Sequence, residues 1–375
     1  MLDPTTVHRA SELTLDGLIE YAASQNASDI FLKVGGPPGL RVSGRIVKTP
    51  FPALGPIDSE RLAYEHLDAR QRTEFERELE MNLSFTVPNV ARIRQNIYRE
   101  RGLVATTCRL ISLRVRSLAE IGVHSEAIKT MTHASHGLVL VTGPTGSGKT
   151  TTLAGMIDHI NKERPVNIIT QEDPIEYVYT DKQAIISQRE IGIDTKSFGE
   201  ALRQVLRQTP DVILIGEMRD LETLNVALQA AETGHLVFGT LHTSSAAETL
   251  DRISNMFAPH ERPMLWLRLS TTLRGVVSQK LVPRADGEGR VVAQEIMVVT
   301  PTISKLLEEG KSGELYTAIR QGGQEEYWGM QTMNQCLEKL VADGLISEDE
   351  ALAKAGNLTE MKQSLRRSLN LRRAA

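Results

Sequence analysis

Gly143-Pro144-Thr145-Gly146-Ser147-Gly148-Lys149-Thr150 is the stretch that decides the fold of this chain. It matches the phosphate-loop pattern G-x-x-x-x-G-K-[ST], whose glycines let successive backbone N–H groups turn toward phosphate oxygens. An apolar strand precedes the loop, and the apolar spacing from Leu153 to Ile160 predicts a helix after it. Because a helix N-terminus favours anions, the stretch predicts a nucleoside triphosphate site rather than an unliganded glycine-rich turn.

Each residue type in the loop has a chemical task. Lys149 is expected to neutralise the terminal phosphates of ATP, and the hydroxyl of Thr150 to bind Mg²⁺. The residues expected to contact the nucleotide are Gly143, Pro144, Thr145, Gly146, Ser147, Gly148, Lys149, Thr150 and Thr151.

The composition is that of an ordinary globular protein. The chain of 375 residues is 41% hydrophobic and 24% charged, and its formal charge of -4 gives no overall attraction to nucleic acid or anionic lipid. No apolar run approaches the roughly 20 residues that span a bilayer. Cys108 and Cys336 lie far apart, which predicts two buried or half-buried thiols in a reducing cytoplasm rather than a metal site.

The first third differs in pattern from the rest. Alternating apolar residues predict a small α+β domain over residues 1–113, with a largely antiparallel sheet. Residues 114–122 are polar and are interpreted as a linker, and residues 123–375 as the second domain.

The second domain alternates between strands and helices. Its candidate strands are residues 138–142, 166–170, 212–215 and 236–241. Strands separated by helix-length segments predict an α/β fold with a parallel sheet covered on both faces. From about residue 301 the pattern is mainly helical, and Thr332 with Gln335 predicts a capping box at the start of one helix.

Hydrolysis of ATP also needs carboxylates near Mg²⁺ and the attacking water. The apolar strand 212–215 leads to Glu217, the layout of a Walker B element, but Gly216 stands where an aspartate is usual. Glu217 is therefore expected to serve the metal alone, through a water. The strand at 166–170 leads to Glu172, which is expected to orient or deprotonate the attacking water, unless Glu172 and Asp173 merely cap the following turn.

Histidines bracket the last candidate strand. His242 follows its C-terminal end, where the ligand crevice of a parallel sheet lies, and is expected to contact the γ-phosphate. His235 precedes its other end and is expected to reach a neighbouring subunit more easily than the same phosphate. His124, His133 and His136 are interpreted as structural or solvated.

Four motifs occur in order: the phosphate loop, the acidic box 169–176, the strand 212–220 and the histidine box 234–243. Together they closely resemble the type II/type IV secretion ATPase superfamily, and within it the type IV pilus retraction (twitching motility) ATPases. Further similar segments are Ser28-Asp29-Ile30, Met330-Gln331-Thr332 and residues 216–223, so that the resemblance covers about residue 13 to residue 360.

The resemblance implies a homo-hexameric ring in which each subunit has a PAS-like N-terminal domain and a RecA-like motor domain. It implies ATP and Mg²⁺ as ligands, and ATP hydrolysis coupled to mechanical work. The expected partners are an inner-membrane pilus platform protein and, indirectly, the base of the pilin fibre. The expected location is cytoplasmic, at the inner membrane through partners and without direct insertion.

The resemblance also implies arginines of the N-terminal domain that close on the nucleotide. If Arg101-Gly102 is a two-residue hairpin turn, Arg94 lies directly opposite Arg109, with Arg92 on the same face. Like charges directly opposite are destabilising, so the pair is better tolerated beside a bound anion. A solvated basic face is the alternative.

One segment departs from the retraction ATPases. Their motor core is usually followed by a helix similar to Ala-Ile-Arg-Asn-Leu-Ile-Arg-Glu, whereas residues 302–311 keep the apolar spacing without either arginine. An accessory retraction ATPase, or a paralogue that powers another pilus or type II secretion machine, therefore stays open. A nucleic-acid motor and a non-hydrolysing ATP-gated scaffold are remoter alternatives, because the chain lacks a basic, aromatic strand-binding platform and has complete acidic boxes.

Overall fold

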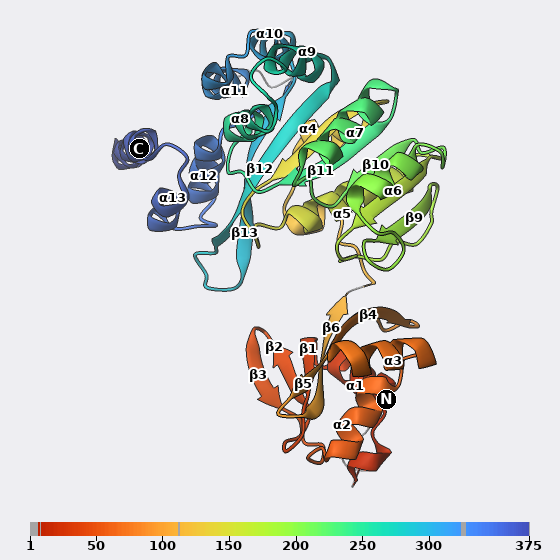
Figure 1. Ribbon diagram of the computed structural model, residues 1–375. Helices are drawn as coiled ribbons and strands as arrows, with labels where there is room; N and C mark the ends of the chain where they lie inside the picture. The colour runs from red at the N-terminus through yellow and green to blue at the C-terminus, as the bar shows by residue number, and fades with distance from the viewer. Residues whose placement is uncertain (1–6, 8, 112, 324–327, 375) are drawn as a thin grey trace. The chain divides into compact units, whose positions relative to one another are not determined.

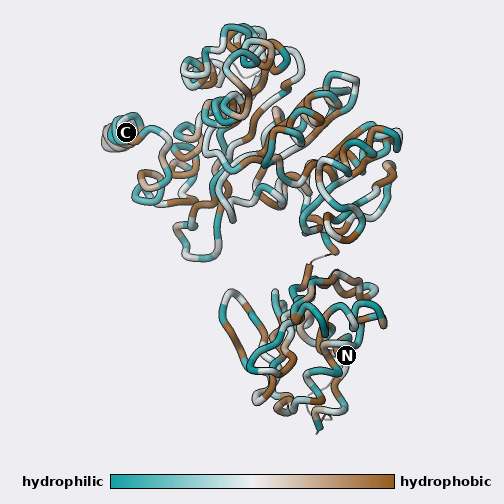
Figure 2. Tube along the Cα trace, viewed as in Figure 1, coloured by the Kyte–Doolittle hydropathy of each residue, from teal (hydrophilic) through white to brown (hydrophobic). Residues whose placement is uncertain are grey.

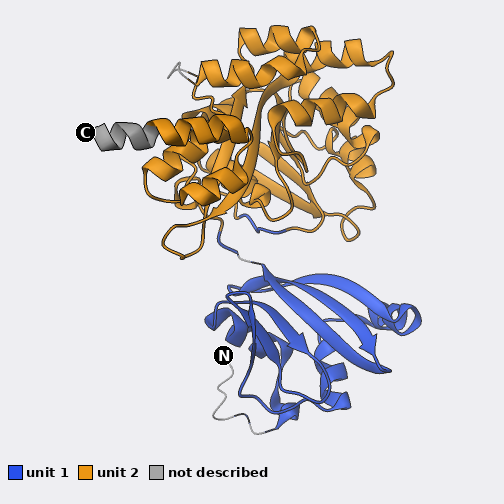
Figure 3. Cartoon of the chain, turned by 90° about the vertical axis from the view of Figure 1, so that its left-hand side faces the viewer, with its two compact units in different colours: residues 1–114, 176–179 blue, residues 115–175, 180–375 orange. Residues whose placement is uncertain are grey.

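The computed structural model describes residue 7 and residues 9–111, 113–323 and 328–374. The chain divides into two compact units, Met1–Arg114 with Glu176–Tyr179, and Val115–Ile175 with Thr180–Ala375 (Figure 3). None of the helices in these described residues combines the length and the apolarity needed to cross a bilayer.

Unit 1 has a six-stranded antiparallel sheet of order β3-β2-β1-β6-β5-β4. Its elements are η1 (Ala10–Glu12), α1 (Leu15–Ser24), β1 (Ala27–Leu32), β2 (Gly39–Val42), β3 (Arg45–Lys48), α2 (Pro56–Tyr64), α3 (Ala69–Glu78), β4 (Glu80–Val87), β5 (Ala91–Glu100) and β6 (Leu103–Ile111). Helices α1 and α2 bury their apolar sides on the sheet in one core, and Phe75 of α3 packs with Ile97 of β5 in another. The α+β arrangement agrees with the apolar alternation of the sequence.

Unit 2 contains the remaining elements. They are η2 (Ala119–Ile121), α4 (Glu126–His133), β7 (Gly137–Thr142), α5 (Lys149–Glu163), β8 (Asn167–Glu172), β9 (Ile185–Glu190), α6 (Phe198–Val205), β10 (Val212–Ile215), α7 (Leu221–Glu232), β11 (Leu236–Leu241), α8 (Ala246–Met256), α9 (Arg262–Thr272), β12 (Leu273–Pro283), β13 (Arg290–Val298), α10 (Pro301–Glu308), η3 (Ser312–Glu314), α11 (Leu315–Gly322), α12 (Met333–Ala342), α13 (Glu348–Lys354) and α14 (Leu358–Ala374).

The seven strands of unit 2 form one sheet of order β13-β12-β7-β11-β10-β8-β9 (Figure 1). The four expected strands are confirmed as β7, β8, β10 and β11, which pair in parallel. Burial explains their composition. Leu138 and Leu140 join the large core formed with α6 to α9, while the alternate residues Val139 and Val141 are equally buried on the opposite face.

The sheet extends beyond the four expected parallel strands. Strand β12 pairs in parallel with β7 but antiparallel with β13, so the sheet is mixed. Strands β9, β12 and β13 were not expected from the sequence. Helix α9 ends at Thr272 and β12 begins at Leu273, so no glycine or proline separates the helix from the strand.

The helices beyond residue 301 are confirmed as α10 to α14. The capping box at α12 forms as expected, because Thr332 Oγ1 accepts from the Gln335 N–H at 3.2 Å and Gln335 Oε1 accepts from the Thr332 N–H at 2.8 Å. Helices α12 to α14 pack on Val282 and Ala293 in a separate small core. Figure 2 shows the hydrophobic positions recurring along the strands and the helices that pack on them.

The two cysteines lie where the sequence predicted buried or half-buried thiols. Cys108 is buried in unit 1 and Cys336 is half-buried in unit 2. Burial raises the pKa of the Cys108 thiol to about 12, so it stays protonated and inert.

Candidate nucleotide site

The phosphate loop runs from the end of β7 to the start of α5. Gly143, Gly146 and Gly148 have φ values of 146°, 76° and 88°, a region that side-chain-bearing residues rarely adopt. At Gly143 space is also limiting, because a Cβ would lie 2.4 Å from the Gln279 carbonyl oxygen and 2.5 Å from Ser147 Oγ. The local backbone therefore requires the glycines that the motif supplies.

Lys149 spans the loop that precedes it. Its Nζ donates to the carbonyl oxygens of Gly143 at 2.8 Å and Pro144 at 3.2 Å, and only 9% of the residue is exposed. Thr150, in the first turn of α5, is half-buried. The ammonium group is thus held inside the loop, where a phosphate can accept its hydrogen bonds in place of the carbonyls.

Gln279 braces the loop from β12. Its Nε2 donates to the Ser147 carbonyl oxygen at 2.9 Å, and the residue is 1% exposed. Beside it, Thr142 at the end of β7 shares a hydrogen bond of 2.8 Å with Ser278 Oγ of β12. Neither residue of β12 was predicted as part of the site, because the strand itself was not expected.

Glu217 lies just beyond the C-terminal end of β10. One carboxylate oxygen accepts from Arg219 at 2.6 Å, and the other is 3.0 Å from His242 Nε2. The hydrogen bond from Arg219, and then the charges of His242 and Lys149, lower the pKa of Glu217 against the opposing effect of burial. The site therefore brings His242 and Glu217 together and keeps the carboxylate ionised.

The glycine at position 216 has a packing reason. Its N–H donates to the Gln171 carbonyl oxygen of β8 at 2.7 Å. A Cβ at this position would lie 3.2 Å from that oxygen and 3.3 Å from Glu172 Cα, tighter than ordinary contact. A side chain at position 216 would therefore require the backbone of β8 to shift by a few tenths of an ångström.

Glu172 is the last residue of β8 and is 5% exposed. Its Oε1 accepts from Thr170 Oγ1 at 2.7 Å and from Gln188 Nε2 of β9 at 3.1 Å. Asp173, by contrast, is exposed. These two donors orient the Glu172 carboxylate, and neither was singled out from the sequence.

His235 lies at the opposite end of β11 from His242. Its Nδ1 is 2.9 Å from the Ala230 carbonyl oxygen at the end of α7. Lys149 and Glu217 follow β7 and β10, and Glu172 ends β8, at the carboxyl edge of the sheet, which His235 does not reach. The role expected for His235 toward a neighbouring subunit stays a prediction.

The arginine register in unit 1 is as expected. Arg101 and Gly102 have φ values of 54° and 79°, and Arg94 pairs with Arg109 across the hairpin. A bound anion beside this pair stays a prediction, and the structure adds a second compensating charge for Arg109. The buried Asp29 accepts from Arg109 Nε at 3.0 Å and from Arg41 Nε at 3.1 Å, so a carboxylate of the same sheet already compensates the charge.

A cavity of about 520 Å³ adjoins the phosphate loop within unit 2. Its lining includes Thr151, Gln279, Leu281, Val292, Arg284 and Arg290. Leucine and valine offer apolar contact, and the arginines offer donors and planar stacking surfaces. The cavity therefore combines apolar and cationic groups beside the phosphate loop.

The chain is similar to known secretion and pilus proteins. The profile of the family described as type II/IV secretion system protein matches residues 106–352. The chain is 47% identical over 338 residues to the type IV pilus retraction ATPase PilT of Pseudomonas aeruginosa, covering 90% of this chain and 97% of that protein. It is 44% identical over 324 residues to a twitching motility protein of Neisseria gonorrhoeae, covering 86% of each.

A solved structure is similar over the same extent. The crystal structure of the pilus retraction motor PilT with bound ADP matches with a TM-score of 0.87 at 42% identity, over 94% of this chain and 99% of that chain. The family profile, the similar sequences and the similar structure all indicate the same family. The chain therefore belongs to the type II/IV secretion system protein family.

Proposed function

We propose that the chain is an ATPase that binds ATP on the phosphate loop and hydrolyses it. The observation that carries this proposal is the meeting of Lys149, Glu217 and Glu172 at the carboxyl edge of one sheet. Lys149 exchanges its loop carbonyl partners for the β- and γ-phosphates, and residues 143–151 cradle the phosphates. The adenosine lies in the adjoining cavity beside Thr151 and Leu281.

Glu172 orients the attacking water and accepts its proton, because its carboxylate is buried and already held by Thr170 and Gln188. His242 contacts the γ-phosphate and returns to Glu217 after hydrolysis. Thr150 and the ionised Glu217 are hard oxygen donors, which fit Mg²⁺, with Glu217 acting through a water. Mg²⁺ would supply charge neutralisation of the phosphates.

Two substitutions test the hydrolytic site. Lys149→Ala is expected to abolish ATP binding, whereas Glu172→Gln is expected to keep binding and lower turnover by at least ~100-fold. Asp173→Asn is the matched control, because the neighbouring carboxylate is exposed and should leave turnover nearly unchanged. Turnover retained in Glu172→Gln would assign the base elsewhere, with Glu217 as the next candidate.

We further propose that hydrolysis drives type IV pilus retraction. The similarity to the pilus retraction ATPase PilT over nearly the whole chain supports this role. In this proposal residues 1–113, a linker 114–122 and the motor domain 123–375 form each subunit of a cytoplasmic homo-hexamer. Arg94 and Arg109 close on the nucleotide, and the ring turns a platform protein of the inner membrane that releases pilins from the fibre base.

The alternative function is that of an accessory retraction ATPase. The sequence of α10 supports this alternative. Ile303 and Leu307 of this helix are buried, so the apolar spacing serves packing. The two positions where retraction ATPases usually carry arginine hold Ser304, which donates to the Ser270 carbonyl oxygen at 3.0 Å, and the exposed Glu308. Neither Ser304 nor Glu308 supplies the positive charge of an arginine.

Deletion of the gene with imaging of pili tests the direction of work. Hyperpiliated cells that do not twitch are expected for a retraction motor, and complementation with Lys149→Ala should fail to restore motility. Bald cells would indicate an extension motor, and partial loss of retraction force with normal pilus numbers would indicate the accessory role. Unaltered pili would point to another secretion machine.

A further inference from the structure

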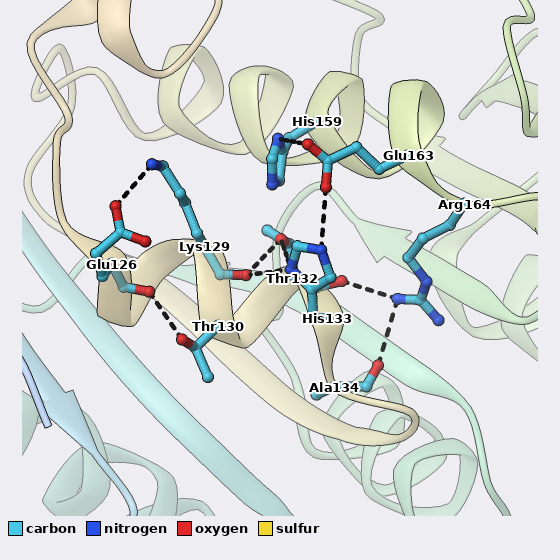
Figure 4. A network of polar contacts seen from close by, with 9 residues as sticks. All are labelled: Glu126, Lys129, Thr130, Thr132, His133, Ala134, His159, Glu163 and Arg164. Atoms are coloured by element: carbon cyan, nitrogen blue, oxygen red, sulfur yellow. Dashed lines mark hydrogen bonds and ion pairs between the residues drawn. The ribbon is translucent and has the colours of Figure 1, made fainter. Parts of the chain in front are cut away.

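A cluster of two histidines and one glutamate lies on unit 2, at the opposite end of α5 from the phosphate loop. His133 is in the last turn of α4, and His159 and Glu163 are one turn apart near the end of α5. One ligand atom from each lies within 4.8 Å of the others. Figure 4 shows His159 and Glu163 projecting from α5 toward His133 on α4.

The hydrogen bonds of His133 define its tautomer. Its Nδ1 is 2.9 Å from the Lys129 carbonyl oxygen, which only accepts, so Nδ1 must carry the proton. In the neutral ring the lone pair of Nε2 then faces the Glu163 carboxylate, with 3.0 Å between Nε2 and Oε2. Two acceptors in this arrangement need a cation between them, either a proton or a metal ion.

His159 adds a second imidazole to the same carboxylate. Its Nδ1 is 3.3 Å from Glu163 Oε1, and its ring meets that of His133 edge-on with centroids 5.4 Å apart. The Glu163 carboxylate thus has an imidazole nitrogen near each of its two oxygens. Metal ions bind the neutral imidazole.

The two helices are held in place independently of these side chains. Arg164, directly after α5, donates from one guanidinium nitrogen to the carbonyl oxygens of Thr132 at 2.8 Å and Ala134 at 3.3 Å. The lysines on the same helices are paired elsewhere, Lys129 with Glu126 at 2.7 Å and Lys162 with Asp158 at 2.6 Å. Neither ammonium group therefore occupies the position between the histidines and Glu163.

We propose that His133, His159 and Glu163 form a binding site for a divalent transition metal ion, Zn²⁺ in particular. Two imidazoles and a carboxylate are a donor set that Zn²⁺ takes, with a water as fourth ligand. Zn–N and Zn–O bonds of about 2.0–2.2 Å place tetrahedral ligand atoms roughly 3.3 Å apart. The separations of 3.0 Å and 3.3 Å between the histidine nitrogens and Glu163 match this spacing.

The site joins the end of α4 to the end of α5, so the bound ion stabilises unit 2. The other histidine and carboxylate group in the described residues, Asp16, Glu65 and His66 of unit 1, is less suitable. It has a single imidazole, and the Glu65 carboxylate already accepts from the Leu15 and Asp16 N–H groups at the start of α1. That group is explained as a helix cap.

Titration of the full-length protein tests the proposal. Protein stripped of metal by a chelator and free of nucleotide is titrated with Co²⁺, and Zn²⁺ is then used to displace the visible absorption of bound Co²⁺. One equivalent is expected to bind per chain. His159→Gln and Glu163→Gln should each weaken Zn²⁺ binding by at least ~10-fold, because the loss of even outer-shell groups has effects of this size.

His66→Gln is the matched control and should leave Zn²⁺ affinity unchanged. Thermal unfolding gives a second readout, because Zn²⁺ should raise the Tm of the unaltered chain and of His66→Gln but not of Glu163→Gln, whereas the same concentration of Mg²⁺ should raise none. No saturable Zn²⁺ binding would mean that the cluster is only a protonated histidine–glutamate pair. Loss of binding in His66→Gln or His242→Gln, with retention in His159→Gln, would place the ion elsewhere and overturn the proposal.

Discussion

At the scale of single residues, the candidate site depends on groups whose charge is set by their neighbours. Glu217 is 22% exposed and lies between Arg219 and His242, with Lys149 also lowering its pKa. Glu172 is buried but has two neutral donors on one oxygen. The two carboxylates therefore have different surroundings. Glu217 is suited to bind a cation, and Glu172 is suited to bind a water.

Glu217→Gln is expected to change the acid side of the stability curve. The folded pKa of Glu217 is lower than the usual value of about 4.3, so its stabilising effect is present above that pH and is lost as the pH falls through the folded pKa. Tm measured from pH 3 to pH 7 without nucleotide should fall less steeply on acidification in Glu217→Gln. An unchanged acid slope would mean that the ion pairs of Glu217 contribute nothing to folding.

Gly143→Ala is expected to destabilise the chain before any nucleotide binds. The new Cβ would overlap the Gln279 carbonyl oxygen and Ser147 Oγ, and such overpacking costs about 1–3 kcal/mol. Gly146→Ala is the matched control, because Gly146 also has a positive φ but no atom within 4 Å of a Cβ. Chemical denaturation of the unliganded proteins should therefore show the larger loss for Gly143→Ala, and equal losses would attribute the effect to backbone strain alone.

At the scale of elements, the residues of a turn were enough to predict how the two strands beside it pair. The Arg101-Gly102 turn fixes the register of β5 against β6, because both of its residues adopt positive φ as a two-residue hairpin requires. The carboxylate that compensates Arg109 comes from β1, which the turn does not specify. Its identification needed the order of the strands in the sheet.

Asp29→Asn is expected to destabilise unit 1. The buried Asp29 carboxylate accepts from arginines on both neighbouring strands, and hydrogen bonds to charged groups contribute about 1.5–3 kcal/mol in favourable cases. Because Arg41 and Arg109 are themselves 39% and 64% exposed at the side chain, a loss of about 1–2 kcal/mol is expected. The exposed pair of Arg72 with Glu60 supplies the control, since Glu60→Gln should change the free energy of unfolding by less than ~1 kcal/mol.

At the scale of the whole molecule, separate cores predict separate unfolding. Among the described residues, the cores of unit 1 and unit 2 have no member in common, so calorimetry should resolve two transitions. Asp29→Asn should lower the transition of unit 1. ADP at about 100 times its Kd should stabilise unit 2 by about 2.7 kcal/mol and have this effect in the native chain but not in Lys149→Ala.

A single transition that responds as a whole to both changes would contradict this expectation. It would mean that the two units unfold as one cooperative body. The measurement also separates the effect of the nucleotide on its own domain from any effect on the arginine-bearing sheet.

The sequence by itself determined the phosphate loop, the four central strands, the hairpin register and the carboxylates that follow the strands. These features depend on short-range chemistry: glycines that permit positive φ, apolar runs of strand length, and acids placed after them. Tertiary structure alone decided that β12 lies beside β7, so that Gln279 donates a hydrogen bond to the loop. It also decided that the backbone of β8 lies close to Gly216, where a side chain would be crowded. It also brought His133 to His159 and Glu163, because α4 and α5 meet only after the chain has folded.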